Sequence, residues 1–369
     1  MIHLPYESFD ESVVNFLYSA ANDKDVLAIK QTLYRVSSSS PVVQALEKAV
    51  QNGKQVTVLM EVKARFDEAN NILMARRLEK AGAHVIYGLV GLKTHSKCTL
   101  VIRREKDGIR RYVHVATGNY NASTAKLYTD LGILTCNDLF GIDASAFFNL
   151  LSGYSDPPIW DSFIVAPINL RQRCIELIDR EIHFAKNGED AHMIAKMNSL
   201  LDKGIIEKLY EASQAGVKIE LIVRGICVLI PGIPGVSDNI TVRSIVGRFL
   251  EHSRIFWFRN GGREELYISS ADWMPRNLND RVELMVPIED PEIKRRLKQM
   301  VDIELSDNQK AHIMQADGTW LKTISAENQL CAQEYFQKIA EKRDAEDEMT
   351  LAQKLEPYTP VLGHGDGSD

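Results

Sequence analysis

The sequence predicts an α/β protein made of two tandem α/β domains that are related by internal duplication. Three observations lead to this prediction. Apolar strand-like runs alternate with helical runs, the same order of runs recurs in the second half, and both halves carry a histidine followed two residues later by a basic residue. The chain of 369 residues is long enough for two domains, each with its own core. The two triplets are His95-Ser96-Lys97 and His252-Ser253-Arg254.

The first half reads as alternating helix and strand. An amphipathic pattern predicts a helix over 10–21, and the apolar run that follows predicts a strand over 26–34. Ser40 and Pro41 mark the start of a helix that ends at Asn52-Gly53. The later elements of this half are expected to be strands over 55–62, 83–87, 97–102 and 110–116 and a helix over 70–81.

The second half repeats this plan in the same order. Its expected elements are strands over 192–197, 217–224 and 266–270 and a helix over 205–215. Lys196 corresponds to Lys30, and the segment 269–273 is taken as the counterpart of 117–121. Several matches in one order are hard to obtain by chance, so we infer a duplicated unit.

These boundaries divide the chain into a first domain over 1–155 and a second domain over 156–325. The turn-forming run Ser152–Pro158 is the expected linker. A C-terminal helix is predicted over 326–348, and the tail over 349–369 has too little apolar surface to fold.

Composition narrows the classes of function. The net charge of −6 argues against a general nucleic-acid-binding surface, while basic residues gather around the first triplet and favour a local pocket for a polyanion. No apolar run reaches the length of a membrane span, and the N-terminus lacks the pattern of a secretory signal. The five cysteines are scattered, which is typical of reduced thiols in a cytoplasmic protein and argues against a zinc site.

Each triplet places an imidazole beside a fixed positive charge, a combination suited to chemistry on phosphate. Side chains two positions apart on a strand point the same way, so Lys97 is expected beside His95 and Arg254 beside His252. An isolated histidine is more often structural, but its repetition favours a functional role. We therefore expect one active site to which both halves contribute.

Further candidates lie where predicted strands end. Arg35, Arg65 and Arg224 each follow a strand, at the edge where open α/β sheets bind ligands, and together favour a phosphate clamp. Asn119 follows the strand over 110–116 and can reach phosphate or a histidine nitrogen, although a simple turn explains it equally well. Tyr128 can stack on a base or donate to phosphate, although a lone tyrosine is more often part of a core.

A duplicated α/β unit with His-x-Lys and a downstream Gly-x-Asn resembles the phospholipase D superfamily. A closer resemblance, over about residues 4–340, is to the C-terminal catalytic half of bacterial polyphosphate kinases of the first type. It rests on long collinear motifs: Leu33-Tyr-Arg-Val, Val62-Lys-Ala-Arg-Phe-Asp-Glu, Gly91-Leu-Lys-Thr-His-Ser-Lys, Thr117-Gly-Asn-Tyr-Asn, Asp202-Lys-Gly, Leu221-Ile-Val-Arg-Gly-Ile-Cys, Ser237-Asp-Asn-Ile, Arg248-Phe-Leu-Glu-His-Ser-Arg and Ser269-Ser-Ala-Asp-Trp-Met. The fold implied is two tandem phospholipase D-like domains.

The resemblance implies an ATP–polyphosphate phosphotransferase. Enzymes of this family pass the γ-phosphoryl group of ATP reversibly to inorganic polyphosphate through a phosphohistidine. His95 matches the histidine that is phosphorylated, and His252 matches a second essential histidine near the nucleotide phosphates. Arg224 and Tyr128 match positions that contact the nucleotide.

Mg²⁺ is the cofactor that the resemblance implies. Arg35 and Arg65 match positions assigned to the Mg²⁺ site. Because a guanidinium and Mg²⁺ are both cations, phosphate oxygens are expected to bridge them.

The expected partners are ATP or ADP and polyphosphate, with no nucleic acid and no integral membrane segment. Members of the family carry two further domains upstream and assemble as homo-oligomers, so this chain is expected to be part of a longer protein. Its expected location is the cytoplasm, with peripheral association with the inner membrane left open.

Two alternatives remain at this stage. One is a phospholipase D-like phosphodiesterase. Two features argue against it: the long interval between His95 and Asn119, and the lack of an acid shortly after either triplet. The other is an inactive fragment that only binds polyphosphate.

Overall fold

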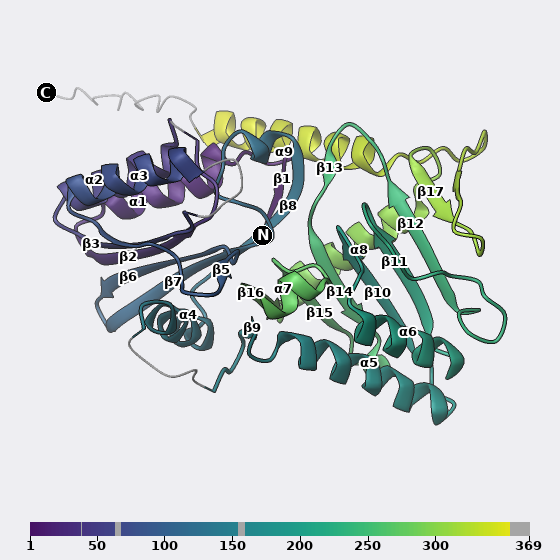
Figure 1. Ribbon diagram of the computed structural model, residues 1–369. Helices are drawn as coiled ribbons and strands as arrows, with labels where there is room; N and C mark the ends of the chain where they lie inside the picture. Colours follow the sequence, from purple (N-terminus) through teal and green to yellow (C-terminus); the bar gives the residue numbers. More distant parts are fainter. Residues whose placement is uncertain (38, 63–67, 154–158, 355–369) are drawn as a thin grey trace, which may run out of the picture.

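The computed structural model describes residues 1–37, 39–62, 68–153 and 159–354. Within them the chain forms two large sheets that lie side by side (Figure 1). The elements of the first half are β1 (Ile2–Leu4), a π-helical turn (Asp10–Val14), α1 (Asn15–Asn22), β2 (Val26–Leu33), α2 (Pro41–Gln51), β3 (Gln55–Met60), α3 (Glu68–Ala81), β4 (His84–Ile86), β5 (Lys93–Thr94), β6 (Cys98–Glu105), β7 (Gly108–Ala116), a 3-10 turn (Thr124–Lys126), β8 (Tyr128–Thr135) and α4 (Asp138–Leu151).

The second half runs from β9 to the C-terminal helix α9. Its elements are β9 (Ile164–Ala166), α5 (Leu170–Lys186), β10 (His192–Met197), α6 (Lys203–Gln214), β11 (Lys218–Val223), β12 (Ile240–Ile245), β13 (Leu250–Glu251), β14 (Arg254–Phe258), a 3-10 turn (Asn260–Gly262), β15 (Glu265–Ser269), α7 (Pro275–Asn279), β16 (Arg281–Pro287), α8 (Pro291–Ser306), β17 (Ala311–Met314), β18 (Trp320–Lys322) and α9 (Ala332–Lys354).

The two sheets share one strand order, which confirms the predicted pair of duplicated α/β domains. The first sheet runs β1-β8-β7-β6-β2-β3-β4. The second runs β16-β15-β14-β10-β11-β12 and continues into β17 and β18, with β9 antiparallel to β16. The strands at equivalent positions in the two sheets are therefore β2 and β10, β6 and β14, β7 and β15, and β8 and β16. In both sheets three parallel strands, β2-β3-β4 and β10-β11-β12, lie beside a set of antiparallel strands.

Each half lends one short strand to the sheet of the other half. β5, just before the first triplet, pairs in parallel with β16 of the second sheet. β13, just before the second triplet, pairs in parallel with β8 of the first sheet. This reciprocal exchange brings the two triplets to the junction of the domains and relates them by a pseudo-two-fold axis.

Three buried clusters hold the layers together. One lies between α1–α3 and the first sheet, and another lies between α5, α6 and the second sheet. The third is shared, because it joins residues of the first sheet and α4, such as Cys98 and Phe147, with residues of the second sheet and α8, such as Trp257 and Leu297. Figure 1 shows α9 reaching from the second domain across to the first, above β1 and β8.

Most elements that the sequence predicts are confirmed, and local chemistry explains their ends. The Ser40 hydroxyl accepts a hydrogen bond from the Val43 amide, and Pro41 opens α2. Gly53 follows α2 with a φ of +78°, a conformation that glycine adopts without strain. The elements without a predicted counterpart include strands β8, β12, β14 and β16 and helices α4, α5 and α8.

The C-terminal helix differs from its predicted span of 326–348. α9 begins at Ala332 and continues to Lys354, six residues into the predicted tail. Asp307 sets the start, because its Oδ2 accepts a hydrogen bond from the Ala332 amide at 2.8 Å. Asn308 holds the preceding loop through backbone hydrogen bonds with Leu330 and Ser325. Residues 355–369 and most of the predicted linker, 154–158, lie outside the described residues.

Among the helices that the structure describes, none is both long enough and apolar enough to cross a bilayer.

Candidate active site

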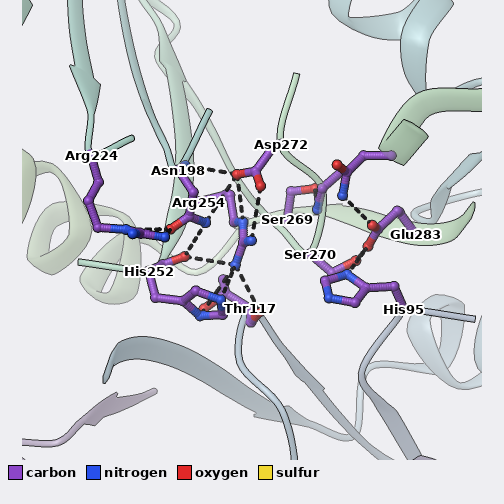
Figure 2. Close-up of polar contacts among 12 residues, drawn as sticks. His95, Thr117, Asn198, Arg224, His252, Arg254, Ser269, Ser270, Asp272 and Glu283 are labelled. Carbon is purple, nitrogen blue, oxygen red and sulfur yellow. Dashed lines mark hydrogen bonds and ion pairs between the residues drawn. The ribbon is translucent and has the colours of Figure 1, made fainter. Parts of the chain in front are cut away.

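The two triplets lie together at the junction of the domains, each at the start of a central strand. His95 and its neighbours connect β5 to β6, and His252 and Ser253 connect β13 to β14. Figure 2 shows both imidazoles among buried acids, amides and guanidinium groups. The structure therefore brings together four residues predicted to be catalytic, His95, Lys97, His252 and Arg254.

His95 is held by a carboxylate from the other domain. Its Nδ1 lies 2.9 Å from Oε2 of Glu283, a wholly buried residue of β16. Glu283 is held in turn by the Ser270 hydroxyl and by Nδ2 of Asn277, the latter at 2.6 Å. Because Nδ1 is engaged, Nε2 is the imidazole nitrogen available to attack a substrate. Tyr34 packs edge-on against the imidazole, with ring centroids 4.7 Å apart.

His252 is held by the mirror arrangement. Its Nδ1 lies 2.8 Å from both carboxylate oxygens of Asp130 on β8, in the first domain. The Thr117 hydroxyl donates to Oδ1 of Asp130 at 2.6 Å, as the Ser270 hydroxyl donates to Glu283. Each histidine thus receives its carboxylate from the opposite half of the chain.

Both predicted cations lie against their histidines. Nζ of Lys97 is 3.1 Å from Nδ1 of His95, and the Arg254 guanidinium is 3.3 Å from Nε2 of His252. Arg254 also forms an ion pair with Asp272, at 3.1 Å between Nε and Oδ1. Asp272 accepts from the amide and the side chain of Asn198. The cation of the second triplet is therefore fixed more rigidly than that of the first.

Burial and the surrounding cations keep the two imidazoles neutral. Burial, and then the charges of Lys97, Arg281 and Arg254, hold the pKa of His95 well below its usual range. Burial also lowers the pKa of His252, although Asp130 opposes the shift. A neutral imidazole is the form that can act as a nucleophile.

Burial has different net effects on the pKa values of Lys97 and Arg254. Burial lowers the pKa of the Lys97 ammonium to about 7, while Glu283 and Asp130 oppose this shift and Arg254 and Arg281 reinforce it. Burial also acts to lower the pKa of Arg254, but its ion pair with Asp272 prevails and raises it. Lys97 is therefore the cation of the site whose charge depends on pH near neutrality.

The hydrogen bonds correct one alignment made from the sequence. Thr117 corresponds to Ser270, not to Ser269, because the Thr117 and Ser270 hydroxyls accept hydrogen bonds from the equivalent amides of Leu131 and Leu284. The hairpins between the triplets and these residues differ in length, which hid the offset. With this register Asn119 is the counterpart of Asp272.

The remaining predicted residues fall into three groups. Tyr128 contacts His252, with ring centroids 5.1 Å apart, and Arg224 donates to Oδ1 of Asn198 at 2.8 Å. Tyr128 and Arg224 line one groove together with residues 245–251. Arg35 follows β2, next to Tyr34, and Asn119 has a buried Oδ1. Arg65 lies outside the described residues.

Sequence reasoning missed the carboxylates that hold the histidines. A signal was present, because Asp130 and Glu283 are charged residues inside otherwise apolar strands, and a buried charge there requires a partner. It also missed Tyr34 and Arg281, the latter paired opposite Lys93 where β16 meets β5.

The chemistry of arginine does not fit a cage of protein ligands around Mg²⁺. A guanidinium offers only donors and cannot ligate Mg²⁺. Among the described residues, no three His, Cys, Asp or Glu side chains are grouped so that they could hold a metal ion.

Two family models cover nearly the whole chain. Residues 1–157 match the model described as polyphosphate kinase C-terminal domain 1, and residues 163–333 match that of C-terminal domain 2.

Close relatives carry the same name. The chain is 60% identical over 310 residues to polyphosphate kinase of Halalkalibacterium halodurans, covering 84% of this chain and 44% of that protein. It is 55% identical over 345 residues to polyphosphate kinase of Synechocystis, covering 92% and 47% of the two chains. The chain thus spans about half the length of the curated relatives it matches.

Solved structures agree with these matches. The crystal structure of polyphosphate kinase from Porphyromonas gingivalis superimposes with a TM-score of 0.87 at 39% identity, over 94% of this chain and 53% of that one. Phosphatidylserine synthase of Haemophilus influenzae shares the fold alone, with a TM-score of 0.53 at 12% identity over 92% of each chain. The chain belongs to the polyphosphate kinase family and contains the two C-terminal domains of that family.

Proposed function

We propose that this chain forms the catalytic part of a polyphosphate kinase, which transfers the γ-phosphoryl group of ATP reversibly to inorganic polyphosphate through a phosphohistidine at His95. One observation carries the proposal. A neutral, buried imidazole is held by Glu283 at Nδ1, so that Nε2 is free to react, among cations suited to phosphate. Membership of the family supports the choice of substrates.

In the proposed first step, Nε2 of His95 attacks the γ-phosphorus of ATP. The new N–P bond forms as the bond from phosphorus to the β–γ bridging oxygen breaks, and ADP leaves with that oxygen. Glu283 keeps the proton of the imidazole on Nδ1 and balances the positive charge that develops on the phosphorylated ring. In the second step a terminal oxygen of polyphosphate attacks the same phosphorus and breaks the N–P bond, which restores neutral His95.

The cations stabilise charge on the transferred group. Lys97 and Arg254 lie beside the two imidazoles, and Arg224 lies at the groove that Tyr128 also lines. These groups are assigned to the phosphate oxygens, where positioned positive charge lowers the barrier of a loose transition state. Arg35, and Arg65 by resemblance, are assigned to the same cluster of phosphates. Asn119 is assigned a supporting contact to phosphate.

His252 is assigned to assist the departure of the leaving group, ADP. Its Nδ1–H is held by Asp130, so Nε2 of the neutral ring carries no proton. We assign His252 to act as the imidazolium, protonated as the anionic nucleotide enters and favoured by Asp130, with Nε2–H donating to the bridging oxygen as ADP departs. Tyr128 packs on this imidazole and is assigned to the nucleotide. This assignment makes His95 the covalent carrier and His252 the orienting residue.

Mg²⁺ is proposed to enter with the nucleotide rather than to occupy a cage of protein ligands. When bound to ATP, it neutralises charge on the β- and γ-phosphates. The arginines would bind phosphate oxygens of the nucleotide and would add their positive charge to that supplied by the metal. The cytoplasm, which supplies ATP and keeps the thiols reduced, is the proposed location.

The test is to incubate the protein with [γ-³²P]ATP and Mg²⁺ and to look for label that is stable to base and labile to acid. Wild type is expected to acquire this label on His95 and to release it on addition of ADP or polyphosphate. His95→Ala is expected to remain unlabelled, because the nucleophile is gone.

His114→Gln is the matched control, since His114 is a buried histidine of β7 with no place in the proposed chemistry. It is expected to label like wild type, provided that thermal unfolding shows the fold retained. Labelling of His95→Ala at the wild-type level would overturn the proposal. Cleavage of a model phosphodiester without nucleotide would favour the phosphodiesterase alternative instead.

A further inference from the structure

A buried ionic cluster lies directly behind the second triplet. Nζ of Lys196 on β10 lies 2.7 Å from Oε2 of Glu251 and also contacts Oε1 of Glu304 on α8. These three side chains are only 2–4% exposed. Removing charges from water is costly, so the ion pairs and hydrogen bonds of this cluster must offset a large desolvation penalty. Glu251 is of particular interest because it immediately precedes His252.

Glu251 connects to His252 through the first domain. The Thr129 hydroxyl donates to Oε2 of Glu251 at 2.7 Å and accepts from the backbone amide of His252 at 3.2 Å. Asp130, the next residue on β8, holds the His252 imidazole. The carboxylate of Glu251 therefore helps to fix the register between β13 and β8, on which the position of His252 depends.

Gln333, in the first turn of α9, anchors the same segment from the other side. Its Nε2 donates to Oε1 of Glu251 at 2.6 Å and to the Phe249 carbonyl at 2.9 Å. Its Oε1 accepts from the Phe249 amide at 2.9 Å. A Cβ atom on Gly247 would lie 2.3 Å from this oxygen, so a side chain there would displace Gln333. The amide of Gln333 thus holds the segment 247–251 at three points.

This segment forms one wall of the groove beside the active site. Residues 245–251 line the groove together with Tyr128 and Arg224, and Leu250 of β13 is paired with Tyr128 of β8. The first turn of α9 therefore acts on the groove from behind, through Gln333, without facing it.

The first half supplies an internal comparison. Lys30 is the counterpart of Lys196 but is only half-buried, and Thr94 stands where Glu251 stands in the second half. The Thr94 amide donates to Glu61 instead, at 2.9 Å. One copy of the unit thus folds without this cluster, so the cluster is a feature of the second triplet and not a requirement of the fold.

We propose that Glu251 and Gln333 are positioning residues for the nucleotide. They hold the segment 247–251 and His252 in the arrangement that receives the β- and γ-phosphates, which makes the first turn of α9 part of the nucleotide site. The inference rests on the proposed function, since it takes the groove lined by Tyr128, Arg224 and segment 245–251 to be the place where ATP binds.

The experiment compares Gln333→Ala with Gln337→Ala. Gln337 lies one turn further along α9; within the described part of the chain its side chain bonds to Glu341 of the same helix and not to segment 247–251, so it is a matched control. Phosphorylation of His95 by [γ-³²P]ATP is measured over a range of ATP concentrations, together with the melting temperature. Gln333→Ala is expected to raise the ATP concentration for half-maximal labelling about tenfold, because three hydrogen bonds to the groove wall are lost. The rate at saturating ATP is expected to stay within about twofold of wild type.

A double variant separates positioning from simple stability. Gln333→Glu places a carboxylate against Glu251 and is expected to weaken ATP binding further. Adding Glu251→Gln exchanges donor and acceptor, so the pair can bond again and part of the affinity is expected to return. A purely structural role predicts a lower melting temperature with unchanged half-saturation, and that result would overturn the inference.

The two proposals fail in different ways. If wild type acquires no label on His95, the proposed function is wrong. If wild type is labelled normally and Gln333→Ala gives the same half-saturation as Gln337→Ala, the proposed function stands and the positioning role is wrong.

Discussion

The residue that follows each histidine by two positions differs between the halves, and this difference has a chemical consequence. Lys97 is buried and contacts His95, while Arg254 is held by an ion pair with Asp272. Burial first, and then Arg254 and Arg281, lower the pKa of Lys97 to about 7. Lys97 is therefore charged below about pH 7 and neutral above it, whereas a guanidinium stays charged throughout.

The first prediction follows from this titration. Between pH 7 and 9 the ATP concentration for half-maximal labelling of wild type is expected to rise about tenfold, as Lys97 loses the charge that binds phosphate. Lys97→Arg is expected to remove most of this rise, because its cation does not titrate in that range. Half-saturation measured at intervals of pH tests both statements, and equal slopes for the two proteins would contradict them.

A second prediction concerns the close approach of Gly118 to Asp130. A Cβ atom on Gly118 would lie 2.2 Å from the Asp130 carboxylate, which would have to move away from His252. Gly118→Ala is expected to lower the rate of His95 phosphorylation by about tenfold or more, since His252, which is assigned to the departing ADP, is no longer held in position by Asp130.

The control for Gly118→Ala is Ala271→Gly, because Ala271 occupies the equivalent place in the second half. That variant opens space without pushing Glu283. A wild-type rate in Gly118→Ala would show that Asp130 can move without disturbing His252.

How far the site could be predicted depends on where its parts come from. His95 and Lys97 share one strand, so a two-residue spacing was enough to place them side by side. Glu283 and Asp130 lie far from their histidines in the sequence, and they reach them only through the exchange of β5 and β13. A repeat shows that two halves are alike, but it does not show which half completes which site.

At the scale of elements, the start of the second domain is fixed to a helix of the first. Asp143 in α4 is buried, and its carboxylate accepts hydrogen bonds from the amides of Asp161, Ser162 and Phe163. Phe163 packs in turn against Phe140 and Phe147 of α4. This contact sets where the chain enters β9 after it leaves the first domain.

The third prediction tests this anchor. Asp143→Ala is expected to reduce the free energy of unfolding by about 2–4 kcal/mol, because buried amides lose their acceptor. Asp138→Ala, at an exposed position in the first turn of the same helix, is expected to cost less than about 1 kcal/mol. Urea unfolding of the two variants distinguishes these values, and equal losses would show that Asp143 is no special anchor.

Elements with a plain hydrophobic period were predictable, and those of the site were not. β3 and β11 are buried parallel strands with nearly continuous apolar runs. β8 and β16 carry acids at positions where the period expects apolar residues, because these strands serve the histidines. The chemistry of the site therefore obscured the pattern of the strands that build it.

On the scale of the whole molecule, the two domains share a core. Residues of both sheets and of α4 and α8 form one buried cluster, and each sheet includes a strand from the other half. Unfolding of one domain would therefore expose apolar surface of the other domain to water, which is unfavourable.

The fourth prediction is that the described domains unfold together. Calorimetry is expected to show one transition whose calorimetric and van't Hoff enthalpies agree. Two well-separated transitions would mean that the shared cluster and the exchanged strands contribute little to stability.

The exchange of β5 and β13 also bears on how such a protein could arise. A solitary ancestral unit could not have supplied a carboxylate to its own histidine, because each histidine here is served by the opposite half. The ancestor would have needed a second copy of itself, arranged as a symmetric homodimer with two identical sites. Fusion of two such copies into one chain would have allowed their sequences to diverge, so that, under the proposed function, one histidine could carry the phosphoryl group and the other could assist the departure of ADP.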